Sequence, residues 1–192
     1  MVEAARGLFL ERGYGATTVE AISERADVPT ATVYRLFSSK VGILKALLDI
    51  TIVGDDADVP LAARPEVRAL LEAADPREQL AGLVAVASGV NQKVAPLYRI
   101  LVSAAGNDPG AGALLDELTA QRQRGQHGIA RSLARRGALR SDVRERDAAD
   151  VIHALASPEL FRLLVLDRGW AIERYERWLT DALAEQLLPP PR

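Results

Sequence analysis

A short stretch in the first quarter of the sequence holds several side chains that can donate hydrogen bonds to a polyanion. Thr30 and Tyr34 carry hydroxyls, Arg35 carries a forked guanidinium and Lys40 carries an ammonium group. Hydroxyl and ammonium donors suit phosphate oxygens, whereas a guanidinium fork can pair bidentately with guanine. Thr30 and Ala31 lie at the start of a helical stretch, and residues at the start of such a helix usually contact the base edges of DNA. These residue types therefore favour contact with a nucleic acid.

Two short helices must position these side chains. The run Thr17-Thr18-Val19-Glu20 predicts a capping box, in which the Thr17 hydroxyl accepts the amide of Glu20. Asp27-Val28-Pro29 ends this helix, and a second helix runs from there to Phe37. Two short helices joined by about three to four residues are typical of a helix-turn-helix, which places its second helix in the major groove of DNA.

Breaker and capping residues mark the ends of the other helices. Gly13 predicts the end of the first helix, and Ser38 or Ser39 predicts the start of the fourth. Gly42, early in that fourth helix, costs about 1 kcal/mol relative to alanine. Three later helices are predicted to begin where a capping residue precedes a proline, at Asp75-Pro76, Asp108-Pro109 and Ser157-Pro158.

The long segments that follow carry the helical period, and none shows a sustained period of two. We expect Pro96 to divide a helix of residues 77–94 from one of 96–105, because proline cannot donate inside a helix. Gly137 should end a helix of residues 110–136, and a final helix is expected near 172–188. The sequence predicts an all-α protein, with an N-terminal three-helix helix-turn-helix domain of residues 1–50, a linker of residues 51–59, a larger C-terminal helical domain of residues 60–188, and a tail of residues 189–192.

Composition narrows the classes of function. The chain has no cysteine and two histidines, His127 and His153, which removes thiol chemistry and disfavours a structural zinc site, so we expect no metal and no cofactor. The formal net charge is −2, and acidic and basic residues are equal in number over residues 1–50, so any DNA contact depends on where the charges lie. No membrane span or signal peptide is visible, and we expect a cytoplasmic protein.

Two stretches of the sequence resemble the DNA-binding domain of TetR-family regulators. They are Gly13-Tyr14-Gly15-Ala16-Thr17-Thr18-Val19-Glu20-Ala21-Ile22-Ser23-Glu24-Arg25-Ala26-Asp27-Val28 and Thr32-Val33-Tyr34-Arg35-Leu36-Phe37-Ser38-Ser39-Lys40. The resemblance covers residues 2–48 and implies a transcriptional repressor that binds a palindromic operator as a homodimer. It also implies that a C-terminal domain dimerises and binds a small-molecule effector. A weaker resemblance to one branch of the family runs from Ser157-Pro158-Glu159-Leu160 through Trp170, Tyr175 and Leu179.

The sequence departs from the family pattern in four places. Asp27 stands where the turn usually has glycine, and aspartate tolerates the left-handed conformation better than most residues. Pro29 replaces a usual serine cap, so the second helix is poorly capped unless Thr30 serves. Gly42 weakens the fourth helix, and the chain starts almost at the first helix, without a basic arm.

The candidate site residues follow from this interpretation. Arg35 could read a base or bind only phosphate. The candidate effector contacts come mainly from a segment, residues 86–104, in which apolar and polar residues alternate, and a largely apolar effector is expected. The predicted DNA contacts are Thr18, Thr30, Ala31, Tyr34, Arg35 and Lys40, and the predicted effector contacts are Asn91, Tyr98, Ser103, His127 and Trp170.

The later helices suggest further interactions. A stripe on the last helix is predicted to pack on the core of its own chain and on a second copy: Tyr175, Trp178, Leu179, Ala182, Leu183 and Gln186. A second stripe, Leu114, Leu118, Gly125, Ile129 and Leu133, offers another helix to a dimer, and Gly125 and Gly128 suggest a close helix contact. A group of arginines is interpreted as a solvated helix face rather than as a second DNA surface: Arg122, Arg124, Arg131, Arg135, Arg136 and Arg140.

Two alternative functions remain open from the sequence. One is a helix-turn-helix regulator that needs no ligand, which the lack of any pocket of a few hundred cubic ångströms would favour. The other is a helical enzyme that modifies a small molecule, which a convergent set of titratable groups in a pocket would support. No nucleophile elbow, phosphate loop or dinucleotide fingerprint supports an enzyme.

Overall fold

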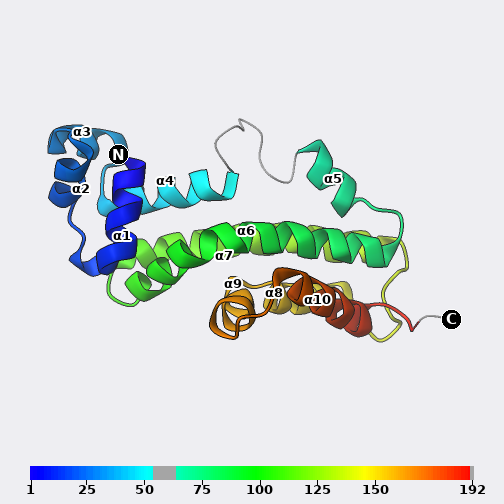
Figure 1. The fold of residues 1–192 in the computed structure, drawn as a ribbon. Coiled ribbons are helices and arrows are strands. Elements are labelled where there is room, and N and C mark those ends of the chain that lie inside the picture. The colour runs from blue at the N-terminus through cyan, green and yellow to red at the C-terminus, as the bar shows by residue number, and fades with distance from the viewer. Residues whose placement is uncertain (54–63, 191–192) are drawn as a thin grey trace. The chain divides into compact units, whose positions relative to one another are not determined.

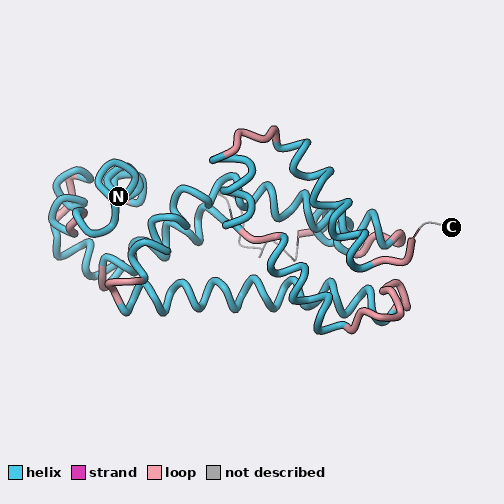
Figure 2. The backbone as a smooth tube through the Cα atoms, turned by 90° about the horizontal axis from the view of Figure 1, so that it is seen from below, coloured by secondary structure: helices cyan, strands magenta, loops and turns pink. Residues whose placement is uncertain are grey.

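The structure of the protein is a computed structural model, and it describes residues 1–53 and 64–190. Within these ranges the chain forms helices and loops without a strand (Figure 2), which confirms the predicted all-α fold. None of the described helices has the length and apolarity that a membrane crossing requires. The helices are α1 (Val2–Ala16), α2 (Val19–Ala26), α3 (Thr30–Phe37), α4 (Lys40–Val53), α5 (Pro65–Leu71), α6 (Pro76–Ala105), α7 (Pro109–Arg135), α8 (Glu145–Leu155), α9 (Pro158–Phe161), the π-helix η2 (Arg162–Asp167) and α10 (Ile172–Leu187).

The described residues divide into two compact units. Unit 1 holds residues 1–53 and 93–119, and unit 2 holds residues 64–92 and 120–190. Unit 1 thus contains the predicted DNA-binding domain of residues 1–50 and, in addition, the turn between α6 and α7. The predicted linker of residues 51–59 lies outside the described residues from residue 54 onwards, and so do residues 191–192 of the predicted tail.

Unit 1 is built around the apolar faces of α1, α2, α3 and α4, which lie next to one another in Figure 1. Phe9 of α1 is fully buried and stacks on Tyr14, with ring centroids 5.8 Å apart. Burial of each large apolar side chain contributes about 1.5–3 kcal/mol. The other core residues of these helices include Leu8, Ile22, Val33, Ile43, Leu44, Leu47 and Leu48.

Unit 2 packs the first part of α6, the second part of α7, and α8 to α10. Gln79 of α6 donates to Ser132 of α7 over 3.1 Å, and Arg77 of α6 pairs with Asp181 of α10. The ring of Tyr175 in α10 meets Phe161 edge-on at 5.3 Å. The core of this unit includes Leu80, Val84, Leu133, Ile152, Leu179, Leu183 and Leu187.

The predicted helix ends are largely confirmed. Asp75, Asp108 and Ser157 each accept backbone amides of the helix that follows. Gly137 takes a φ of 63° directly after α7, as a left-handed stop requires. Ser39 accepts the amide of Gly42 at 3.0 Å and is therefore the cap of α4.

Two predictions about helix ends are wrong. The cap of α2 is Thr18, which accepts the amide of Ala21 at 3.1 Å, and not Thr17. Thr17 is buried, and its hydroxyl lies 2.7 Å from the carbonyl oxygen of Gly13, which holds it inside the fold. Pro96 does not divide a helix, because α6 continues through it from Pro76 to Ala105. Proline removes one amide donor, and the turns on both sides keep the helix intact.

Gly42 has a structural reason that the sequence did not show. A Cβ atom at this position would lie 1.9 Å from the backbone carbonyl oxygen of Phe37. Glycine therefore lets the start of α4 approach the end of α3. This close approach requires a residue whose helix propensity is low. Gly125 differs, because a Cβ atom there would meet nothing within 4 Å among the described residues, so no close helix contact is seen at this position.

Two alanine substitutions test this difference. Gly42→Ala should lower the free energy of unfolding by about 1–3 kcal/mol, because a backbone carbonyl cannot yield as a side chain does. Gly125→Ala is the matched control and should raise it by about 0.5–1 kcal/mol, because alanine restricts the unfolded chain and favours a helix. Urea unfolding followed by circular dichroism measures both. A stable Gly42→Ala variant would contradict the close approach of α3 and α4.

Candidate nucleic-acid interface and buried polar cluster

Helix α3 presents one polar face and buries the other. Val33 is 1% exposed and anchors the helix, whereas Tyr34 is 46% exposed. Ala31 and Arg35 are also exposed, on the same side of the helix as Tyr34. This arrangement leaves methyl, phenol and guanidinium groups available for a partner that lies against α3.

The turn between α2 and α3 is held by a chain of hydroxyls. Asp27 adopts the left-handed conformation with φ 52° and ψ 48°, as predicted for this substitute for glycine. Thr30 donates to the Ser23 hydroxyl at 2.9 Å, and Ser23 donates to the carbonyl of Val28 at 2.5 Å. Pro29 provides no side-chain cap, and Thr30 fastens α3 to α2 instead.

Thr18 and Lys40 have structural roles in unit 1. Thr18 is exposed at the start of α2, and its hydroxyl can still donate because the cap uses it as an acceptor. The Lys40 ammonium donates to the carbonyls of Tyr14 at 2.8 Å and Thr17 at 2.9 Å. It also lies 4.1 Å from the centroid of the Tyr14 ring, within cation–π range. Two of its three donors are thus engaged with backbone carbonyls of unit 1.

Tyr14 connects α1 to the turn between α6 and α7 within unit 1. Its hydroxyl donates to Asp108 at 2.8 Å, and the pKa of Tyr14 is raised, first by burial and then by this carboxylate. The pKa of Asp108 is lowered mainly by the same hydrogen bond. Lys45 of α4 pairs with Glu117 of α7 at 2.6 Å. These contacts fix α1 and α4 to residues 108–117.

The N-terminal helices match a known family. Residues 1–47 match the family described as "Bacterial regulatory proteins, tetR family". Residues 1–47 are thus similar to the N-terminal domain of tetR-family regulators. Over 48 residues it is 44% identical to YvkB, and over 44 residues 43% identical to YdeS, both uncharacterized HTH-type transcriptional regulators of Bacillus subtilis strain 168. These matches cover 25% and 23% of this chain, and 25% and 22% of those proteins.

The fold of the whole chain is also that of tetR-family regulators. NalD of Pseudomonas aeruginosa, the secondary repressor of the MexAB-OprM multidrug efflux pump, superposes with a TM-score of 0.71 at 22% identity, over 99% of this chain and 95% of that one. PfmR of Thermus thermophilus, a TetR-family transcriptional regulator, gives a TM-score of 0.66 at 22% identity, over 98% of both chains. The relatives and structures named here are transcriptional regulators and not enzymes.

The predicted effector contacts are distributed over both units. Tyr98 and Ser103 belong to unit 1, where Tyr98 is half-buried and Ser103 is exposed. In unit 2, His127 Nε2 lies 3.1 Å from Glu145 Oε1. The guanidinium carbon of Arg174 lies 3.8 Å from the ring centroid of Trp170, within cation–π range. Asn91 is 5% exposed, and its Nδ2 atom has no hydrogen-bond partner among the described residues. Of the five predicted contact residues, Asn91 is the one that is buried. The role of all five residues in effector binding stays a prediction.

The interior of unit 2 contains a polar network that the sequence analysis missed. Arg122 donates from Nη2 to His153 Nε2 at 3.2 Å, and His153 Nδ1 donates to Gln126 at 2.7 Å. Gln126 is 5% exposed, and Arg122 is half-buried rather than on a solvated face, so that interpretation is wrong for Arg122. The available signal was the position of Arg122 and Gln126 on the core stripe that continues to Ile129 and Leu133.

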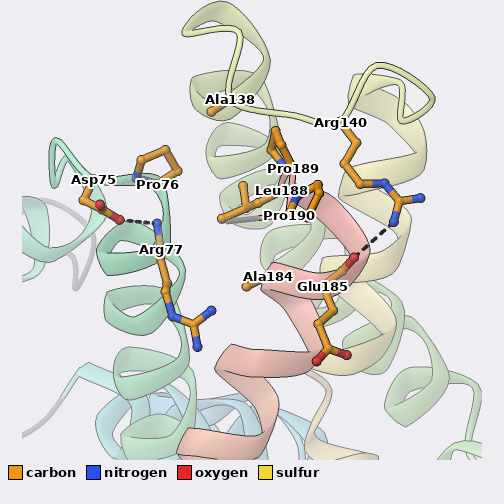
Figure 3. Close-up of a pocket in the computed structure, with 10 residues that line it drawn as sticks. All are labelled: Asp75, Pro76, Arg77, Ala138, Arg140, Ala184, Glu185, Leu188, Pro189 and Pro190. Carbon is orange, nitrogen blue, oxygen red and sulfur yellow. Dashed lines mark hydrogen bonds between the residues drawn. The ribbon is translucent and has the colours of Figure 1, made fainter. Parts of the chain in front are cut away.

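A groove with a volume of about 780 Å³ lies on the surface of unit 2 (Figure 3). Its two arginines are already engaged: Arg77 pairs with Asp181, and Arg140 pairs with Asp142 at 2.8 Å and donates to the Glu185 carbonyl at 3.1 Å. The rest of the surface that lines the groove is largely apolar. The lining residues are Asp75, Pro76, Arg77, Ala138, Arg140, Ala184, Glu185, Leu188, Pro189 and Pro190.

His153 predicts a dependence of stability on pH. Burial lowers the pKa of His153 below its usual 6.5, and Arg122 lowers it further, whereas Glu159 and Asp150 oppose this. The unfolded chain therefore binds more protons below pH 6.5, and stability is lost as the pH falls from there toward the folded pKa. His153→Gln should flatten the slope of unfolding free energy between pH 7 and 5.

The control for this prediction is His127→Gln, which removes the other histidine and leaves the His153 network in place. The comparison of the two variants isolates the contribution of His153. Urea unfolding at half-unit pH steps measures the slopes. If His153→Gln keeps the slope of the unaltered protein, the buried neutral imidazole is contradicted.

Proposed function

We propose that this protein is a transcriptional repressor in which α3 lies in the major groove of operator DNA. The exposed face of Ala31, Tyr34 and Arg35, on a helix anchored by buried Val33 in a tetR-family domain, is the observation that carries this proposal. Thr18 at the start of α2 and the remaining Lys40 donor would contact phosphates. Because residues 1–50 have no excess of basic charge, these few contacts supply most of the affinity.

Two substitutions separate base reading from phosphate contact. Arg35→Ala should weaken binding to the preferred duplex by about 1–3 kcal/mol and relax the preference at one position in each half-site, if the guanidinium reads guanine. Lys40→Ala should weaken preferred and scrambled duplexes alike and reduce the log–log salt slope by about one. Selection from random duplexes, followed by titrations at several salt concentrations, measures both.

Controls are needed for charge and folding. Arg124→Ala removes the same charge at an exposed position in unit 2 and should leave DNA binding unchanged. Since Lys40 also holds two backbone carbonyls, its variant must be shown to be folded at the temperature of the titration. Equal losses on both duplexes for Arg35→Ala would make Arg35 a phosphate contact. No loss for Lys40→Ala would reject this docking.

The proposed repressor acts as a homodimer, so that two copies of α3 meet a palindromic site. Half of the predicted stripe on α10 is used by its own chain, because Tyr175, Leu179 and Leu183 are fully buried. The apolar side chains left for a second copy are Trp178, at 36% exposure, with Leu163 at 44% and Leu166 at 52% from η2.

Leu166→Asp tests this surface. A charge in the centre of an apolar interface is left desolvated, so the variant should be monomeric at micromolar concentration while the unaltered protein is dimeric. Val102→Asp is the matched control, because Val102 is 45% exposed but belongs to unit 1. Light scattering measures the mass. A dimer for Leu166→Asp, or a monomer for the unaltered protein, would reject the proposed interface.

The proposed repressor also responds to a small molecule bound in unit 2. The support is a set of buried polar atoms without hydrogen-bond partners among the described residues: Asn91 Nδ2, Arg122 Nη1 and Tyr175 OH. Buried polar groups are normally paired, so a ligand that pairs them binds favourably. Release of DNA then requires that the ligand binds the two conformations of the dimer with different affinity.

A further inference from the structure

Three of the helices in unit 2 place polar side chains at one level. The contact of Gln79 with Ser132 sets α6 and α7 side by side in opposite directions. Ser88 lies nine residues beyond Gln79, and Arg122 lies ten residues before Ser132. With a rise of about 1.5 Å per residue, both positions are about 14–15 Å from that contact. Ser88 of α6 and Arg122 of α7 therefore occupy the same level.

Helix α10 brings a third group to this level. Burial raises the pKa of the Glu176 carboxyl, and a hydrogen bond with the Ser88 hydroxyl partly opposes this rise, so Glu176 of α10 lies beside Ser88 of α6. Tyr175 precedes Glu176, is fully buried, and has a hydroxyl without a partner among the described residues. Burial raises the pKa of Tyr175 to about 12, so its hydroxyl keeps its proton. Asn91, one helical turn beyond Ser88, adds an unpaired amide nitrogen.

The unpaired atoms of this layer share one property, which is that each can donate a hydrogen bond. The Arg122 guanidinium and the Asn91 nitrogen can only donate, and Tyr175 is held in its protonated form. Arg122 carries a positive charge, yet none of the ion pairs among the described residues includes it. Its Nη2 atom donates to the neutral ring of His153, and its Nη1 atom is buried without a hydrogen-bond partner among the described residues.

We propose that this layer binds the carboxylate of an otherwise apolar organic acid, with Arg122 as its ion-pair partner and Asn91 and Tyr175 as further donors. The inference rests on the proposed effector site in unit 2 and names the class of its ligand. A single guanidinium with neutral donors balances one negative charge, whereas a phosphate dianion needs more cations. Buried Val84, Phe161 and other apolar residues of the unit suit the apolar body of the acid.

A cation held by Glu176 is the opposing hypothesis, because this carboxyl lies beside Ser88. The two hypotheses predict opposite charges for the ligand. A titration can therefore separate them without knowledge of the natural effector.

The experiment titrates the full chain, without DNA, with matched acids and amides. The probes are phenylacetate with phenylacetamide, octanoate with octanamide, and choline as the cation, followed by calorimetry and thermal shift. At least one acid should bind at least tenfold more tightly than its amide and more tightly than choline. Arg122→Gln should abolish this preference, and Arg122→Lys should keep part of it. Arg124→Gln, two residues away and exposed, should leave it unchanged.

A second variant keeps the test decisive if Arg122→Gln does not fold. Tyr175→Phe removes only the hydroxyl and should weaken the acid at least threefold. The proposal is overturned if no acid binds more tightly than its amide, if choline binds more tightly than the acids, or if folded Arg122→Gln keeps the preference. Failure of DNA selection to enrich any sequence would reject the proposed function instead, because the acid titrations contain no DNA.

Discussion

The order of unit 1 depends on the ammonium group of Lys40. This ammonium group lies at the end of α1, where it donates to the carbonyls of Tyr14 and Thr17 and faces the Tyr14 ring. Tyr14 lies in the last turn of α1, where its carbonyl also accepts the Thr17 amide at 3.3 Å, and Thr17 lies in the segment that joins α1 to α2, where carbonyls need donors other than helical amides. Burial lowers the pKa of Lys40, and Asp108 counters this. One side chain from the start of α4 thus fixes the angle at which α2, and with it α3, leaves α1.

The sequence was sufficient to predict the elements of this arrangement, but not the contacts between them. Periodicity, proline pairs and capping residues predicted most helices, because these signals are local. The cap of α2 lies one residue later than predicted, because the Thr17 hydroxyl is buried and bonds the carbonyls of Gly13 and Leu8. The role of Gly42 depends on how closely α4 follows α3, which no local rule contains.

The two candidate sites differ in how well the sequence could predict them. The exposed face of α3 was predicted because the spacing of Tyr34 and Arg35 against buried Val33 lies within one helix. The polar layer in unit 2 was largely missed, because it is assembled from α6, α7, α8 and α10. Its sequence signal was present in the polar residues Ser88, Asn91 and Gln126 at core positions. Arg122 was interpreted as solvated because a run of arginines usually is.

The two sites also differ in how their polar groups are satisfied. In the turn of the helix-turn-helix, the hydroxyls of Ser23 and Thr30 are paired within the chain. In unit 2, Arg122, Asn91 and Tyr175 each keep a buried atom unpaired by any described residue, which costs free energy in the unliganded protein. A ligand that supplies the missing acceptors recovers this free energy on binding, and mass action then raises the stability of the liganded form. These properties fit the proposed roles, in which unit 1 reads DNA and unit 2 binds a small molecule.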